Sequence, residues 1–194
     1  MMGHESSISG FALILLALLL FLLPLQWVAA MILAMAVHEG CHYLAVRLCG
    51  GEVRRIRVGL NGMKMEVVRL NSFQELLAAL AGPAGGLLLL LTARLLPRTA
   101  VCGAFQALFN LMPVYPLDGG RVLRCCAEIL LPPDKADPVC RAVETVCIAG
   151  ILCLGFYGTI RLRLGIMPLV MAVVLLQRSF VGKIPCKVGL FSVQ

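Results

Sequence analysis

Residues 28–49 read VAAMILAMAVHEGCHYLAVRLC, and this run decides how the chain folds. It is almost entirely apolar, and a helix of this length matches the roughly 30 Å hydrocarbon core of a bilayer. We therefore predict a membrane-spanning helix. The polar residues in its second half are the feature that needs an explanation, because ionisable groups in a bilayer are costly and usually functional.

Those polar residues form an H-E-x-x-H motif, His38-Glu39-Gly-Cys-His42. Positions i and i+4 lie on one face of a helix, so the two imidazoles can bind one Zn²⁺. Glu39 lies beside them and can take a proton from a metal-bound water. The alternative, two core histidines paired with neighbours, is disfavoured inside a membrane. The third histidine, His4, lies in the polar N-terminal tail and is predicted to be solvated.

A catalytic zinc takes three protein ligands and keeps one open position, so a third ligand is needed. The chain has no other histidine in a predicted span, and a carboxylate must serve. Asp118 is the favoured one, within NLMPVYPLDGGR at residues 110–121. Pro113 and Pro116 break the helix there, and such a break survives at membrane depth only inside protein or at a cavity. The alternative for Asp118 is helix capping or pairing with Arg121.

The composition predicts an all-α polytopic membrane protein. Apolar residues make up 60% of the 194 residues and charged residues 14%, against about 25% charged in soluble domains. We predict one transmembrane metalloprotease domain over residues 1–194 and no C-terminal regulatory domain. Six spans are expected, at residues 8–25, 28–49, 73–96, 101–131, 139–157 and 164–180.

A β-hairpin is predicted between the second and third spans, in GEVRRIRVGLNGMKMEVVRL at residues 51–70. Hydrophobic residues alternate on both sides of Asn61-Gly62, which is the strongest short-range hairpin signal. Its proximity to the metal motif suggests that a strand edge pairs with an unwound substrate. Val67 is expected to lie on such an edge.

The net charge of +7 has no accompanying nucleic-acid motif, so we expect a bilayer and no nucleic acid as partner. With both termini in the cytoplasm, thirteen basic residues fall inside and only four outside, as the positive-inside rule favours. The four are Arg94, Arg98, Arg161 and Arg163. The nine cysteines contain no C-x-x-C pair, which argues against a thiolate zinc site or a disulfide framework.

The two motifs together resemble the signatures of site-2 proteases, polytopic zinc enzymes that cut transmembrane segments. The resemblance implies zinc ligation by His38, His42 and Asp118, with Glu39 as general base. It also implies that Asn110 lies near the active centre and holds substrate backbone. The six-span layout is similar to the sporulation-type branch, which processes a membrane-associated sigma-factor precursor. One departure is Gly86, which stands where the family often has Asn.

The predicted function is therefore zinc-dependent hydrolysis of a peptide bond within or next to a transmembrane segment of a membrane-protein substrate. The enzyme is expected in the cell membrane, with a possible regulatory membrane partner. Three alternatives remain open: another membrane zincin of the prenyl-protease kind with Glu128 or Glu144 as third ligand, a non-catalytic metal-binding or transport protein, and a structural membrane protein with a fortuitous motif.

Overall fold

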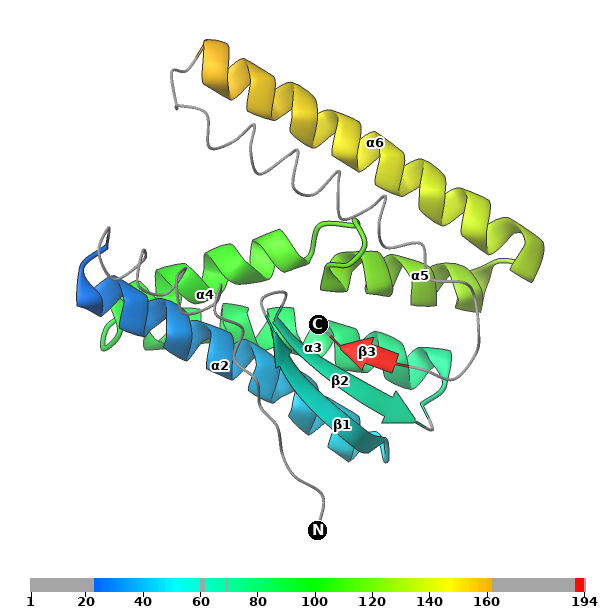
Figure 1. Cartoon of the computed structure of the whole chain (residues 1–194), viewed down its shortest axis with the longest axis horizontal. Coiled ribbons are helices and arrows are strands. Elements are labelled where there is room, and N and C mark those ends of the chain that lie inside the picture. Colours follow the sequence, from blue (N-terminus) through cyan, green and yellow to red (C-terminus); the bar gives the residue numbers. More distant parts are fainter. Residues whose placement is uncertain (1–22, 60–61, 69, 162–190, 194) are drawn as a thin grey trace. The chain divides into compact units, whose positions relative to one another are not determined.

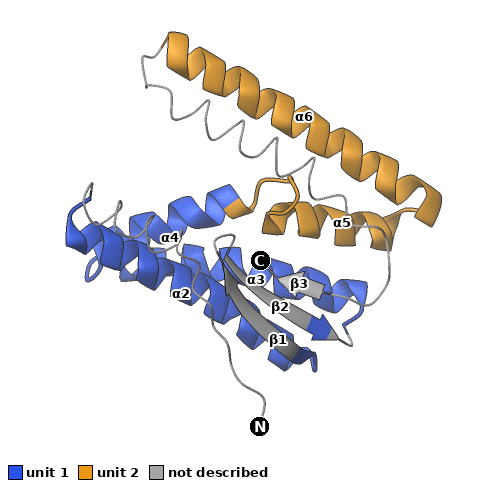
Figure 2. Cartoon of the chain, viewed as in Figure 1, with its two compact units in different colours: residues 1–109, 187–194 blue, residues 110–186 orange. Residues whose placement is uncertain are grey.

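A computed structural model describes residues 23–59, 62–68, 70–161 and 191–193 (Figure 1). The chain divides into two compact units, residues 1–109 with 187–194, and residues 110–186 (Figure 2). Most of the predicted first span and all of the sixth lie outside the described residues, so both spans stay predictions.

The first unit is built on α2 (Leu25–Leu48), α3 (Ser72–Leu88) and α4 (Pro97–Asn110). A short 3₁₀ helix, η1 (Leu89–Thr92), extends α3. The predicted second span corresponds to α2, and the predicted third span corresponds to α3 with η1.

One stripe of α2 is buried at a spacing of four residues, and the remaining surface of the helix is mostly exposed and apolar. The buried stripe consists of Ala30, Ala34, His38, His42 and Val46. Since i and i+4 share a helix face, the histidines lie on the face that packs against the protein. The other face carries leucine, isoleucine and methionine side chains, as expected for contact with lipid.

The start of α3 is fixed to the end of α2 by hydrogen bonds. Asn71 and Gln74 form a capping box, in which the Asn71 side chain accepts from the Gln74 amide and the Gln74 side chain accepts from the Asn71 amide. The same Gln74 side chain donates to the carbonyl of Cys49 at 3.1 Å. These bonds set which turn of α3 lies beside which turn of α2.

Glycines let the helices of this unit approach closely. A Cβ at Gly85 would overlap the side chain of Cys41 in α2, and a Cβ at Gly86 would lie 2.8 Å from the carbonyl oxygen of Gly103 in α4. Gly86 therefore marks a helix crossing with no room for a side chain. This explains why an asparagine is missing here: the position faces the backbone of α4.

The strands of the first unit are β1 (Glu52–Gly59), β2 (Gly62–Val68) and β3 (Phe191–Val193), paired antiparallel in the order β1-β2-β3. β1 and β2 fall in the stretch where the alternation predicts a hairpin. The prediction that Val67 lies on a strand edge is wrong. It pairs with Val53 on one side and Phe191 on the other, and its side chain is buried with Val46 and Ala78.

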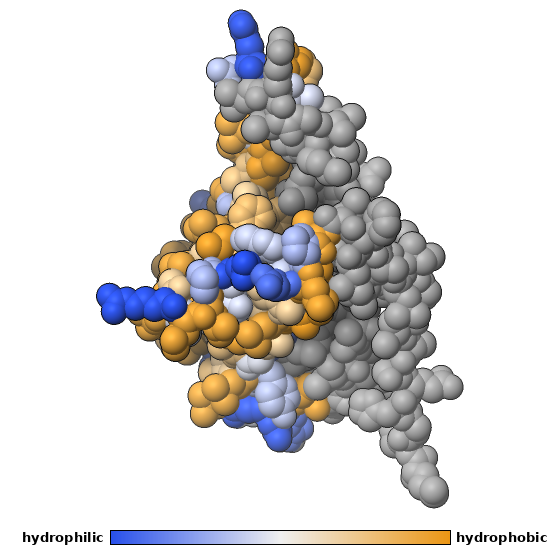
Figure 3. Space-filling view, turned by 90° about the vertical axis from the view of Figure 1, so that its left-hand side faces the viewer, coloured by the Kyte–Doolittle hydropathy of each residue, from blue (hydrophilic) through white to orange (hydrophobic). Residues whose placement is uncertain are grey.

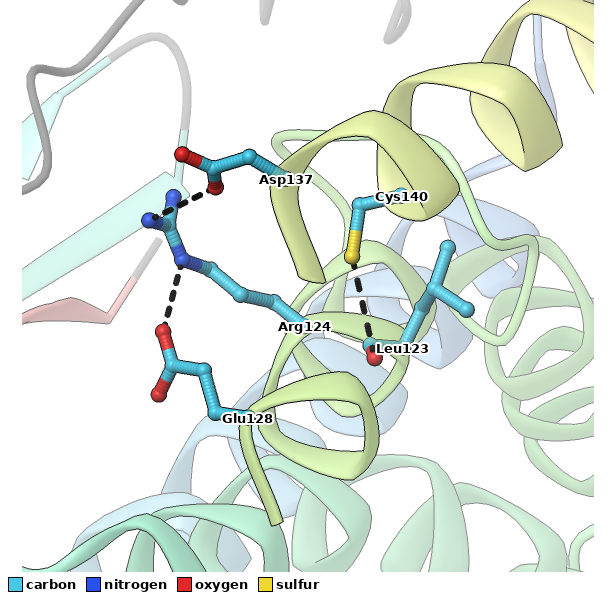
Figure 4. Close-up of polar contacts among 5 residues, drawn as sticks. All are labelled: Leu123, Arg124, Glu128, Asp137 and Cys140. Atoms are coloured by element: carbon cyan, nitrogen blue, oxygen red, sulfur yellow. Dashed lines mark hydrogen bonds and ion pairs between the residues drawn. The ribbon is translucent and has the colours of Figure 1, made fainter. Parts of the chain in front are cut away.

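The second unit contains α5 (Asp118–Leu130) and α6 (Pro133–Ile160), preceded by the irregular segment 111–117. Polar contacts join the two helices (Figure 4). Arg124 of α5 contacts Glu128 at 3.1 Å and Asp137 of α6 at 3.6 Å, and the Cys140 thiol lies 4.0 Å from the Leu123 carbonyl. The predicted fifth span corresponds to the apolar part of α6.

Three described helices are long and apolar enough to cross a membrane: Leu25–Leu48, Ser72–Thr92 and Pro133–Ile160. Large apolar side chains are exposed on all three, and the face in Figure 3 is largely apolar over its coloured part. The predicted fourth span is not one helix. It is divided into α4 and α5, of 14 and 13 residues. At 1.5 Å per residue, each is about 20 Å long, so neither helix crosses the bilayer core by itself.

Candidate metal centre

The two histidines of the motif lie on one face of α2, as their spacing predicts. Their exposed fractions are 2% for His38 and 1% for His42. The rings are nearly perpendicular, with centroids 4.8 Å apart, and their Nε2 atoms face each other at 3.3 Å. Two buried ring nitrogens thus converge on one point, which is the arrangement a chelating pair requires.

The ring of His42 is oriented by α3. Its Nδ1 atom lies 2.7 Å from the carbonyl oxygen of Ala78. A carbonyl can only accept a hydrogen bond, so Nδ1 is the protonated nitrogen and Nε2 carries the lone pair. Metal-binding histidines in proteins commonly have such a partner on the nitrogen that does not bind the metal.

The separation of the two Nε2 atoms fits a shared zinc ion. Zinc binds histidine nitrogen at about 2.0–2.1 Å, and two such nitrogens at a tetrahedral angle lie about 3.3–3.4 Å apart. The observed separation is 3.3 Å. The two imidazole donors, their burial and the tautomer of His42 all suit a divalent metal ion.

Space for the His42 ring is provided by Gly82 of α3, one turn beyond Ala78. A Cβ at position 82 would overlap the ring, with the His42 Cδ2 atom at 2.7 Å and Nε2 closer still. Any other residue at this position would have to displace the nitrogen that is available for a metal. Ala78 and Gly82, one turn apart on α3, therefore both fix the His42 ring: the first through its carbonyl and the second through the space that it leaves.

Glu39 follows His38 in α2 and is half-buried. Successive residues of a helix are rotated by about 100°, so its carboxylate leaves the helix away from the shared direction of the two imidazoles. This placement suits a group that lies next to a metal-bound water better than a metal ligand.

In the second unit, Asp118 is the first residue of α5 and is 4% exposed. The segment 111–117 folds tightly onto this helix start. A Cβ at Gly119 would overlap the Leu111 carbonyl, and a Cβ at Gly120 would lie 2.6 Å from the Tyr115 nitrogen. The two glycines are thus needed because another backbone segment lies against them.

The two other carboxylates considered as third ligand have different contacts within the same unit. Glu128 pairs with Arg124 at 3.1 Å, and more than a third of its side chain is exposed. Glu144 accepts a hydrogen bond from the Tyr115 amide at 3.0 Å. Asn110, the predicted substrate-binding residue, is the last residue of α4 and is half-buried.

Sequence reasoning missed Ala78 as a functional position and did not identify what Gly82 does. The contribution of Ala78 comes from its backbone, which no side-chain motif can reveal. For Gly82 a signal was present, because Ala81-Gly82-Pro83 is unusual inside an apolar helix, where glycine and proline both weaken the helix.

Two comparisons with known proteins found matches to this chain. Residues 11–115 match the family model described as Peptidase M50B-like. The fold resembles the structure of a site-2 protease from Methanocaldococcus jannaschii, with 18% sequence identity, a TM-score of 0.64, and coverage of 92% of this chain and 88% of that chain. No curated protein matches the sequence. The chain therefore belongs to the M50B-like peptidases, the site-2 protease family of intramembrane metalloproteases.

Proposed function

We propose that the chain is a zinc-dependent endopeptidase that hydrolyses a peptide bond within or next to a transmembrane segment of a membrane-protein substrate. The observation that carries this proposal is the His38–His42 pair, whose Nε2 atoms lie 3.3 Å apart on the buried face of a helix apolar enough to span a membrane. Membership of a metalloprotease family supports it.

Asp118 is the proposed third ligand. The described part of the chain holds a set of three buried side chains of metal-ligating type, His38, His42 and Asp118. Two imidazoles and one carboxylate match a common catalytic zinc set with one open position. The contacts of Glu128 with Arg124 and of Glu144 with Tyr115 give these two carboxylates other roles.

Glu39 is the proposed general base. A Zn²⁺ held by these residues would supply two effects, a lower pKa for the attacking water and polarisation of the scissile carbonyl. The Glu39 carboxylate accepts the proton from the attacking water and then delivers it to the departing amine nitrogen. The Ala78 carbonyl meanwhile keeps Nδ1 of His42 protonated, so that Nε2 stays available to the metal.

Substrate binding is proposed to use backbone hydrogen bonds. A transmembrane helix hides its peptide bonds, and once unwound it must find new partners in a medium of low dielectric constant. Among the described strands, β1 pairs only with β2, so it offers an edge for strand addition. Asn110 is the proposed side-chain partner of the unwound segment.

The proposed setting is the cell membrane, with six spans, both termini in the cytoplasm and a membrane-associated protein as substrate. A role in sporulation and a regulatory membrane partner belong to the same proposal and rest on the resemblance to the six-span branch. The three candidate membrane helices of the described residues support the multi-pass setting.

The test is Glu39→Gln, which keeps the size of the side chain and removes its basicity. We expect zinc stoichiometry to stay at the wild-type value, while cleavage of a model transmembrane substrate falls by about 10²–10⁴-fold, the usual worth of a general base. Both are measured on one preparation. Retained zinc with wild-type cleavage would exclude Glu39 as base, whereas a chain that binds zinc but never cleaves would favour a metal-binding or transport protein.

A further inference from the structure

Glu144 is an ionisable residue in α6, inside a helix long and apolar enough to cross a membrane. A carboxylate in such a helix is costly, and it marks a functional position unless a partner explains it. The mechanism above does not use Glu144. One of its contacts is the hydrogen bond that its Oε1 atom accepts from the backbone nitrogen of Tyr115 at 3.0 Å.

Glu144 belongs to the face of α6 that packs within the second unit. Ala136, Cys140, Glu144 and Ile148 follow one another at a spacing of four residues, and Ala136 and Ile148 are buried. The thiol of Cys140, one turn before Glu144, lies against the Leu123 carbonyl of α5 (Figure 4). The carboxylate is therefore held within the unit, and its bond to Tyr115 is partly buried.

The Tyr115 amide is well placed to anchor the segment that leads into Asp118. Pro113 and Pro116 have no N–H, while the amides of Val114 and Leu117 donate to carbonyls inside the segment, those of Met112 and Val114. The Tyr115 amide instead bonds to another helix through Glu144. A Cβ at Gly120 of α5 would lie 2.6 Å from this same nitrogen, so the residue at position 120 has no room for a side chain.

We propose that Glu144 is a positioning residue that holds the segment 111–117, and with it the carboxylate of Asp118, in the geometry that binds the metal. This rests on the proposed function, in which Asp118 is a ligand. The part of Glu144 that carries this role is the acceptor atom bonded to the Tyr115 amide.

The first test measures zinc affinity by chelator competition on the purified full-length chain with four variants: Glu144→Ala, Glu144→Gln, Asp118→Ala and Glu128→Ala. Glu144→Ala should weaken zinc binding by about tenfold or more, as loss of groups that orient ligands does. Glu144→Gln keeps an acceptor oxygen and should stay within about threefold of wild type. Glu128→Ala, the matched removal of a carboxylate from the same unit, should have no effect.

The second test reports on the bond itself. The chain has three tyrosines, so ¹⁵N-tyrosine labelling gives three amide signals, from Tyr43, Tyr115 and Tyr157. In Glu144→Ala the Tyr115 amide should lose protection from hydrogen exchange, and Glu144→Gln should restore it. The amides of Tyr43 and Tyr157 lie inside α2 and α6 and should keep their protection in both variants, which shows that the helices remain folded.

The outcomes separate this inference from the proposal on which it rests. If Asp118→Ala weakens zinc binding but Glu144→Ala does not, the positioning role is wrong and the ligand assignment stands. If Asp118→Ala leaves zinc affinity unchanged, the third-ligand assignment fails and the positioning role fails with it. If Glu144→Gln is as defective as Glu144→Ala, the charge and not the acceptor atom is what matters, and the inference is overturned.

Discussion

The Nδ1 atom of His42 donates to the carbonyl oxygen of Ala78 across 2.7 Å, and this bond joins α2 to α3. Its consequence is that the orientation of the His42 ring, a proposed metal ligand, depends on a helix that supplies none of the proposed ligands. The capping box at Asn71 and Gln74, with the bond from Gln74 to the Cys49 carbonyl, sets the alignment of the two helices that makes this contact possible.

Gly82→Ala should weaken zinc binding by about 10–100-fold, the usual cost of disturbing a group that orients a metal ligand. The added Cβ would overlap the His42 ring, and because it is attached directly to the backbone of α3, the ring has to move. The measurement is zinc affinity, together with the visible absorption spectrum of the Co²⁺-substituted protein, which reports ligand geometry without any need for activity.

Two variants control for the general effect of adding a methyl group. Gly40→Ala adds a Cβ with nothing within 4 Å and should leave zinc affinity unchanged. Gly86→Ala meets the Gly103 carbonyl and should lower stability without altering the Co²⁺ spectrum. An unchanged spectrum in Gly82→Ala would show that the ring is not held in the way described.

Asp118→Ala should lower zinc affinity by more than the 10–100-fold expected for an orienting group, since it removes a ligand. Glu128→Ala should retain the wild-type metal content, because Glu128 pairs with Arg124 on a side that is partly exposed. Elemental analysis after exhaustive dialysis against a weak chelator provides the measurement. Full zinc occupancy in the Asp118 variant would require a different third ligand.

Proline substitutions along β1 should slow cleavage at alternate positions. In an edge strand, successive N–H groups point alternately to the partner strand and away from it. Ile56 and Arg57 are neighbours, so one of the two substitutions, Ile56→Pro or Arg57→Pro, removes a donor that points away from β2. That variant should lose about two- to tenfold in cleavage rate, the worth of one hydrogen bond, with zinc retained. Equal rates for both substitutions and the wild type would argue against strand addition at this edge.

The orientation of the chain can be tested with reporters fused after residue 194. The excess of lysine and arginine in the predicted inner loops favours a cytoplasmic C-terminus. A reporter that is active only in the cytoplasm should therefore work, and one that is active only outside it should not. The opposite pattern would reverse the orientation and place Arg94 of the α3–α4 connection, and Arg98 at the start of α4, inside.

The arrangement of the two histidines could be predicted from the sequence because helical spacing alone places His38 and His42 on one face. Their burial and their convergence at 3.3 Å confirm that expectation. The break in the predicted fourth span was also visible, since Pro113 and Pro116 cannot continue a helix. Each of these inferences needed only residues that are close in sequence.

Contacts between distant segments could not be predicted in this way. The pairing of β2 with Phe191–Val193 occupies the second edge of β2, so that Val67 has a strand on both sides, and no pattern within residues 51–70 signals a third strand so far along the chain. The role of the Ala78 carbonyl was hidden for a related reason. A backbone acceptor carries no mark in the sequence, and its partner is 36 positions away.

The close crossings at Gly82, Gly85 and Gly86 set an unusual pattern of mutational tolerance for the first unit. Lipid tails are as apolar as leucine, so moving a large apolar side chain from lipid into a helix interface brings no gain in hydrophobic free energy. Helices in a membrane therefore associate through close approach of their backbones. The exposed leucines and methionines of α2 should accept almost any apolar replacement. Gly82, Gly85 and Gly86 should accept none, and a saturation library selected for retained fold would show its narrowest variation at these three positions.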